Sequence, residues 1–165
     1  MIIIGIDPGS RKTGYGIIEK DGNRNLYINS GTINLQENLS LADRLVILDE
    51  QLNEILEKFK PDCSSIEAIF FSKNAKSALI LGHARGVALL KLAVHQIPVF
   101  EYTPLEVKQS LVGAGRASKD QVQHMVRVLL NQKQIMMGED EADALANAIT
   151  HAHFIPHLKH HDRLS

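Results

Sequence analysis

Four acidic residues stand at predicted strand ends or at the start of a predicted helix: Asp7, Glu67, Asp140 and Asp143. Asp7 directly follows the apolar run 2–6. Burying a carboxylate beside a core strand is costly unless a positive group pairs with it, and Lys, Arg or a metal ion could be that group. If several carboxylates meet at one sheet edge, their repulsion favours hard divalent cations between them. Oxygen ligands select Mg²⁺ or Mn²⁺ over zinc, and two such ions about 4 Å apart can promote phosphodiester hydrolysis.

The acidic start of the last predicted helix also has a purely structural explanation. Carboxylates in a first helical turn are stabilised by the helix dipole, which accounts for Glu139 and Glu141 without a function. Asp140 and Asp143 are three residues apart and therefore share a face. The dipole explains Asp143 less well, because the apolar body of the helix follows at once. Spacing alone leaves both interpretations open.

The elements that must position these residues follow from the apolar pattern. Ser40 and Ser118 are predicted helix caps, and Pro104 suits a first helical turn. The predicted strands cover 2–6, the segment around 15–18, 25–35, 64–69 and 98–102, and the predicted helices cover 41–59, 74–95, 104–112, 119–129 and 140–153. This order predicts an α/β fold with a mixed central sheet, flanked by helices, whose first three strands are antiparallel.

Length and composition are those of one globular domain. The chain has 165 residues, 44% of them hydrophobic and 22% charged. We expect no membrane-spanning run and no signal peptide, and the single Cys63 fits a reducing cytosol. Residues 70–136 carry nine Lys and Arg against three Asp and Glu, a net charge of +6 in a chain whose total is −1. This basic middle is typical of a polyanion-binding surface, although scattered solvated lysines explain it equally well.

The helix predicted over 74–95 carries small residues at helical spacing. Gly82 and Gly86 are four apart among Ala78, Ala84 and Ala88. Such a stripe lets another helix approach closely, from the same chain or from a partner, and close packing would offset the low helix propensity of the two glycines.

The C-terminal residues 156–165 are polar and rich in histidine. We expect Pro156 to break the last helix and the tail after it to be disordered, so that residues 1–155 form the single domain. The histidines could suggest a transition-metal site, but a solvated tail is the better interpretation.

Short motifs in a specific order run through nearly the whole chain. They comprise residues 5–14, Glu67 with Phe70, 84–87, 107–109, 112–115, Lys119 with 121–126, and 140–148. Together they resemble the RuvC family of bacterial Holliday junction resolvases. The resemblance implies an RNase H-like fold and a Mg²⁺-dependent endonuclease that cuts two strands of like polarity in a four-way DNA junction, in recombination and repair.

The resemblance also implies roles for individual residues. The family's four catalytic acids match Asp7, Glu67, Asp140 and Asp143, which would hold two Mg²⁺ ions, with Mn²⁺ able to substitute. Some members have His at the position of Asp140, so that position is the least constrained.

The DNA-binding residues are predicted in part by resemblance. The family aromatic that stacks in the opened junction matches Phe70, and family lysines that contact DNA match Lys108 and Lys119. Adjacent aromatics at a strand end point in opposite directions, so one of the pair at 70–71 is exposed, and which one stays open. An exposed aromatic near Lys76 suits base stacking. Arg116, in a glycine-flanked loop, is a weaker candidate for a phosphate contact.

The partners follow from the family as well. The resemblance implies a homodimer through helix 74–95, a branch-migration complex of RuvA and RuvB as partner, no membrane association, and a place in the bacterial cytoplasm.

Three other functions compete with this one. The turn from Asp7 to Gly14 also resembles the phosphate loop of actin-like ATPases and sugar kinases, although those folds need roughly twice this chain to clamp a nucleotide. A non-catalytic junction-binding module would not need all four carboxylates. An RNase H-like nuclease acting on RNA differs only in substrate.

Overall fold

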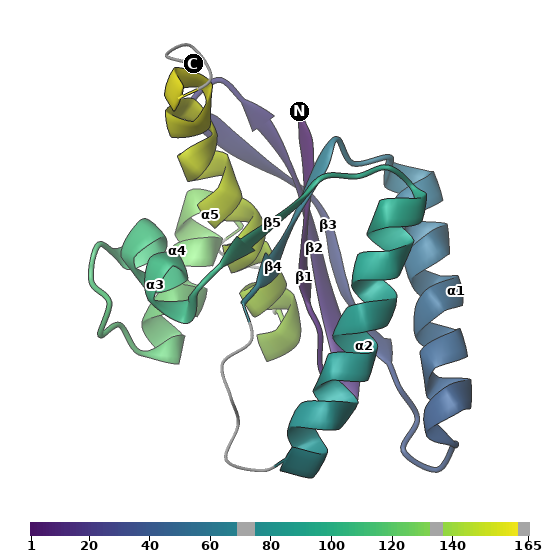
Figure 1. Cartoon of the computed structure of the whole chain (residues 1–165). Coiled ribbons are helices and arrows are strands. Elements are labelled where there is room, and N and C mark those ends of the chain that lie inside the picture. The colour runs from purple at the N-terminus through teal and green to yellow at the C-terminus, as the bar shows by residue number, and fades with distance from the viewer. Residues whose placement is uncertain (69–74, 133–136, 162–165) are drawn as a thin grey trace.

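The computed structural model describes residues 1–68, 75–132 and 137–161, with the backbone alone at 75–76 and 156–161. Five strands form one sheet in the order β3-β2-β1-β4-β5 (Figure 1). The strands are β1 (Ile2–Asp7), β2 (Lys12–Asp21), β3 (Arg24–Asn34), β4 (Cys63–Glu67) and β5 (Val99–Tyr102). β1, β2 and β3 pair antiparallel, whereas β4 pairs parallel with both β1 and β5. The predicted mixed sheet is therefore confirmed.

Helices cover both faces of the sheet (Figure 1). One face carries α1 (Leu41–Phe59) and α2 (Ala75–Val94), and the other carries α3 (Pro104–Val112), α4 (Lys119–Leu129) and α5 (Glu139–His161). Each face has its own apolar core, because residues of β1 alternate between the two. Ile4 and Ile6 belong to the core under α1 and α2, and Ile3 belongs to the core under α5.

Local capping agrees with the sequence. The side chain of Ser40 accepts from the amide of Asp43, and Ser118 forms a capping box with Gln121. Pro104 begins α3 behind the cap Thr103. These caps fix where α1, α3 and α4 start, and so where the loops at the end of the sheet lie.

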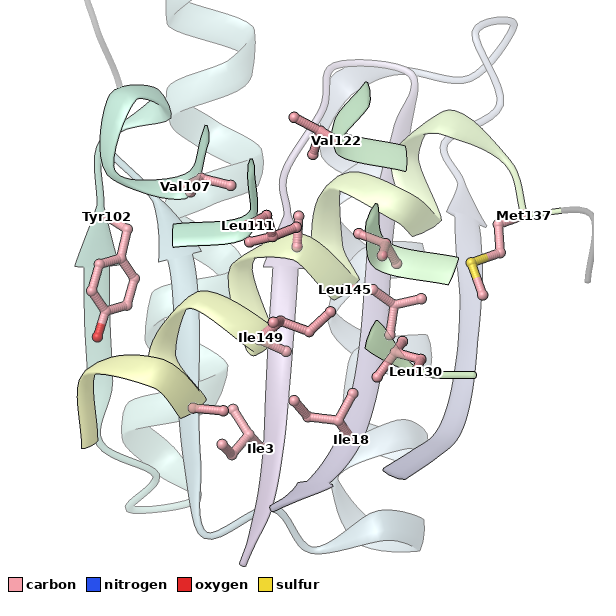
Figure 2. Packing of buried hydrophobic residues seen from close by; sticks show 14 of the residues in the cluster. Ile3, Ile18, Tyr102, Val107, Leu111, Val122, Leu130, Met137, Leu145 and Ile149 are labelled. Carbon is pink, nitrogen blue, oxygen red and sulfur yellow. The ribbon is translucent and has the colours of Figure 1, made fainter. Parts of the chain in front are cut away.

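Helix α5 lies against the centre of the sheet. Figure 2 shows Leu145 and Ile149 of α5 pointing onto Ile3 and Ile18 of the sheet, and all four are fully buried. The close approach depends on glycine in the strands. A Cβ built on Gly5 would lie 1.9 Å from the carbonyl oxygen of Ala144, so only a residue without a side chain fits there.

The last helix is longer than predicted. We expected it to end near His153 and the tail to be disordered from Pro156, but α5 continues to His161. A proline removes a single amide donor from the helix, and the turns on either side can keep its course. That expectation is wrong for 156–161, while residues 162–165 lie outside the described part.

Helix α2 departs from the expectation that no run in the chain is long and apolar enough to span a membrane. Its window Ser77–Val94 has a mean hydropathy of 1.4 and is long and apolar enough, by length and composition, to cross a membrane, and 22% of it is buried. Such a helix is weak evidence for a membrane span. Arg85 and Lys91 inside this window form ion pairs with Glu101 of β5 and Asp49 of α1, which tie α2 to this domain.

Histidine 151 of α5 is buried in an aromatic cluster. It is 1% exposed, its Nδ1 lies 2.7 Å from the hydroxyl of Tyr102, and its ring stacks on Phe100 at 4.1 Å between centroids. Burial lowers the pKa of His151 from 6.5 to about 4. The folded protein therefore keeps this imidazole neutral in moderately acidic solution.

A pH-dependent stability follows from His151. Between about pH 6.5 and pH 4 the unfolded chain binds a proton at this position and the folded chain does not, so the free energy of unfolding falls as the pH drops. The loss at pH 4 approaches about 3 kcal/mol for a shift of this size. In urea unfolding at pH 7.5 and pH 4.5, the His151→Gln variant should lose less stability than the native protein. Equal losses in the two proteins would contradict this assignment.

Candidate active site

Asp7 and Glu67 end two neighbouring strands on the same face of the sheet. β1 and β4 run parallel, with Ile6 paired to Ile66, so the next residues of the two strands lie side by side. Asp7 lies four residues after Ile3 and Glu67 four residues after Cys63, so each shares a face of its strand with that residue, and both Ile3 and Cys63 belong to the core under α5. Both carboxylates therefore stand at the strand ends on the α5 side.

Helix α5 brings the other two carboxylates to this edge. Gly14 pairs with Asp7 across β1 and β2, and a Cβ on Gly14 would lie 2.0 Å from the carbonyl oxygen of Asp140. The first turn of α5 therefore lies against the end of β1 and β2. Asp143 follows three residues later, and it lines a cavity of about 220 Å³ together with Glu67.

The electrostatics reflect this convergence. Burial, followed by the charges of Asp143, Glu67 and Asp140, raises the pKa of Asp7 to about 7. Burial also raises the pKa of Glu67 and of Asp143. A carboxyl group with so high a pKa marks a place that lacks positive charge, which is the condition under which a cation binds.

One lysine supplies part of the missing charge. Nζ of Lys119, at the start of α4, lies 3.1 Å from Glu139 and 3.1 Å from Asp143. Partial burial lowers the pKa of Lys119, but hydrogen bonds and attraction to these two carboxylates outweigh it and raise the pKa. The sequence predicted Lys119 only as a DNA contact and Glu139 only as a helix-dipole residue, because their contact depends on how α4 packs against α5.

The donor set fits a hard divalent cation. Asp7, Glu67, Asp140 and Asp143 offer only oxygen, and the charges of the other three all raise the pKa of Asp7. Within the described ranges, no three Asp, Glu, His or Cys side chains are already gathered as a complete ligand cluster. The four carboxylates therefore match the ligand preference of Mg²⁺ or Mn²⁺. In this structure Lys119 pairs with one of the four, Asp143.

The structure places some of the predicted DNA-binding residues beside the carboxylates, whereas others lie on an exposed loop or outside the described residues. Lys108 of α3 lines the same cavity as Glu67, Asp143 and Lys119. Arg116 is exposed between α3 and α4. Phe70 and the side chain of Lys76 lie outside the described residues.

Comparison with known proteins decides the family. The model of the family described as crossover junction endodeoxyribonuclease RuvC matches residues 3–151. The chain belongs to the RuvC family. A RuvC of Ruminiclostridium cellulolyticum is 50% identical over 151 residues, which cover 92% of this chain and 91% of that protein. A RuvC of Syntrophotalea carbinolica is 54% identical over 153 residues, covering 93% and 94%.

Solved structures agree. Thermus thermophilus RuvC matches with a TM-score of 0.86 at 31% identity, covering 95% of this chain and 96% of that one. Its complex with a Holliday junction substrate matches with a TM-score of 0.89 at 31% identity, covering 94% of each chain. The fold is thus RNase H-like, as the RuvC resemblance implied.

Proposed function

We propose that this RuvC-family protein is a crossover junction endodeoxyribonuclease that resolves Holliday junctions in homologous recombination and DNA repair. The single observation that carries the proposal is the family match over residues 3–151. The Thermus relative whose structure contains a Holliday junction substrate adds support at 31% identity. The four carboxylates at one sheet edge supply the chemistry that such a nuclease needs.

The proposed catalytic residues are Asp7, Glu67, Asp140 and Asp143, and the same four would hold Mg²⁺. Two divalent ions, when bound, would lower the pKa of water and stabilise the departing 3′ oxygen of a phosphodiester, and Mn²⁺ would substitute. Asp7 would belong to the same ligand set, since the charges of the other three carboxylates raise its pKa. Lys119 holds one oxygen of Asp143 in this structure, and a metal ion that took over that oxygen would leave Lys119 paired with Glu139 and able to turn towards a DNA phosphate.

The chain's own basic residues would hold the DNA. Lys108 and Lys119 line the cavity beside the carboxylates, and Arg116 is exposed on the adjacent loop. Such contacts position the backbone without reading sequence, so junction selectivity would come mainly from shape. Phe70 would add stacking at the opened centre, with Lys76 near it, and residues 1–155 would act as one nuclease domain.

A substrate comparison tests this function against the RNA-cutting alternative. The purified protein with Mg²⁺ is incubated with a synthetic four-way DNA junction, the same DNA as a linear duplex, and an RNA–DNA hybrid. We expect paired symmetric nicks in the junction and little cutting of the other two. Preferential cutting of the hybrid would contradict the proposal.

Helix α2 supports the proposed homodimer. Cβ atoms built on Gly82 and Gly86 would meet nothing within 4 Å, so within the described residues no other element covers these two positions. Ala84 and Ala88 of the predicted stripe are instead buried in the core under α1 and α2. Leu79, Leu90 and Val94 of the same helix are 66%, 63% and 66% exposed. An apolar groove over α1 and α2 includes Leu79 and Leu90. A second copy would cover this surface, and the dimer's twofold axis would relate the two active sites to symmetric points of the junction.

The dimer can be tested by charge insertion. Leu90→Lys should weaken self-association by at least about 30-fold, because a lysine would replace a central apolar contact. Sedimentation velocity over a range of concentrations measures the shift. Leu105→Lys, at an exposed leucine of α3, is the matched control and should associate like the native chain. A Leu90→Lys protein that dimerises as tightly as the native one would contradict this interface.

Membership of the RuvC family also supports a proposal for the partner and the cellular location. A RuvA–RuvB branch-migration complex would be the partner, and the bacterial cytoplasm, where the chromosome lies, would be the location.

A further inference from the structure

Arg85 of α2 is a buried cation whose two partners lie at the end of the sheet. The residue is 9% exposed. Its Nη2 lies 2.7 Å from Oε2 of Glu101 on β5, and its Nη1 donates to the backbone carbonyl of Glu67 at 3.3 Å. A guanidinium withdrawn from water is costly unless it is fully paired, so its place beside Glu67 requires a reason.

The sheet itself leaves the Glu67 carbonyl without a donor. β1 and β4 are parallel, and Gly5 pairs with Ser65. If this register continued for two more residues, the amide of residue 8 would donate to the carbonyl of Glu67. Residue 8 is a proline, which has no N–H. The amide that follows Glu67, that of Ala68, donates to Tyr102 on the other side, towards β5. Arg85 therefore supplies the hydrogen bond that Pro8 cannot.

We propose that Arg85 is a positioning residue for the reaction, holding the main chain of Glu67 so that its carboxylate points into the active site. This inference rests on the proposed function, in which Glu67 is a metal-binding catalytic residue. Arg85 does not touch the carboxylate, and it acts from the opposite face of the sheet.

The geometry explains why Glu67 needs this support. Glu67 is the last residue of β4, and its pairing with β1 stops at Ile66. Beyond that point the strand is paired with β5 alone, through Glu67 and Tyr102, and the carbonyl of Glu67 has no ladder donor on the β1 side. A carboxylate displaced by about 1 Å can cost roughly 100-fold in rate. Because α2 also carries the apolar surface proposed for the dimer, the same helix bears on both the interface and the site.

The test replaces Arg85 with methionine, which keeps the length of the side chain and removes its donors. We expect Arg85→Met to lower the single-turnover cleavage rate of a four-way junction by about tenfold or more at unchanged junction affinity, measured by binding in EDTA. A second readout needs no DNA. Calorimetric titration with Mn²⁺ should show weaker metal binding than in the native protein, because Glu67 would be held less firmly.

A matched control lies on the same helix. Lys91 is also largely buried and pairs with Asp49 of α1 at 2.9 Å, away from the strand ends. Lys91→Met removes a comparable ion pair and should leave Mn²⁺ affinity and cleavage rate unchanged. Equal losses in Lys91→Met and Arg85→Met would overturn the proposal, because the effect would then be one of general packing.

A second variant covers the case in which Arg85→Met does not fold. Glu101 is half-exposed, so Glu101→Gln should fold, and it removes the charge that orients Arg85. It should weaken Mn²⁺ binding and cleavage in the same direction as Arg85→Met. If Arg85→Met folds, the inference is overturned when both variants have the native Mn²⁺ affinity and cleavage rate. If Arg85→Met does not fold, native Mn²⁺ affinity and cleavage rate in Glu101→Gln alone overturn it. A native protein that binds Mn²⁺ but does not cut junctions would instead refute the proposed function, while the Mn²⁺ titrations would still test Arg85.

Discussion

Replacing Asp143 with asparagine is expected to lower cleavage of a four-way junction by at least about 100-fold. Asp143 is proposed as a direct metal ligand, and the loss of such a ligand should exceed the 10–100-fold typical of an outer-shell partner. Asp143 lines the same cavity as Glu67 and is one of the carboxylates that raise the pKa of Asp7. Junction binding in EDTA should be preserved or tighter. The substitution removes one negative charge from the surface that meets DNA and frees Lys119 from an ion pair.

Glu141→Gln is the matched control for Asp143→Asn. Glu141 belongs to the same first turns of α5 and loses the same charge, but its carboxylate accepts a hydrogen bond from Ser30 of β3 at 3.1 Å, on the other side of the helix. Gel-based single-turnover assays on both variants give the comparison. An Asp143→Asn protein as active as Glu141→Gln would remove Asp143 from the catalytic set.

Gly5→Ala is expected to destabilise the fold by about 3 kcal/mol or more, at the upper end of overpacking effects. The added Cβ would lie 1.9 Å from the carbonyl oxygen of Ala144 and 2.8 Å from the amide nitrogen of Ala148. Both are backbone atoms of α5, so no side-chain rotation can relieve the contact. The helix would have to move off β1, and Asp143, next to Ala144, would move with it.

Urea unfolding measures this effect, and Gly138→Ala provides its control. A Cβ on Gly138 would lie 3.5 Å from a carboxylate oxygen of Glu141, which is an ordinary contact, so its free energy of unfolding should change by only about 0.5 kcal/mol. If Gly5→Ala were as stable as Gly138→Ala, the close packing of α5 on β1 would be wrong.

Much of the fold was predictable because local signals and tertiary structure agree. The caps Ser40 and Ser118 and the proline at 104 mark helix starts that the structure contains. The end of α5 was not predictable, since a proline is a strong local signal against a helix and only the surrounding structure can override it.

The candidate site was predictable in its residue types but not in its contacts. Strand ends and a helix start led to the prediction of Asp7, Glu67, Asp140 and Asp143. The parallel register of β1 with β4 explains why Asp7 and Glu67 lie side by side, whereas the approach of Asp140 and Asp143 depends on the packing of α5 on the sheet. The ion pair of Lys119 with Asp143 joins residues 24 positions apart and depends on the packing of α4 against α5. The contact of Arg85 with Glu67 likewise depends on where α2 crosses the sheet, which no periodicity specifies.

The most direct test compares the native protein with Asp7→Asn on a synthetic four-way DNA junction in Mg²⁺, with binding measured separately in EDTA. The charges of all three other carboxylates raise the pKa of Asp7, so removing its charge tests the proposed four-carboxylate site directly. We expect paired symmetric nicks from the native protein and no nicks from an Asp7→Asn protein that still binds. Cleavage by Asp7→Asn at the native rate, or tight binding without cleavage by the native protein, would contradict the account.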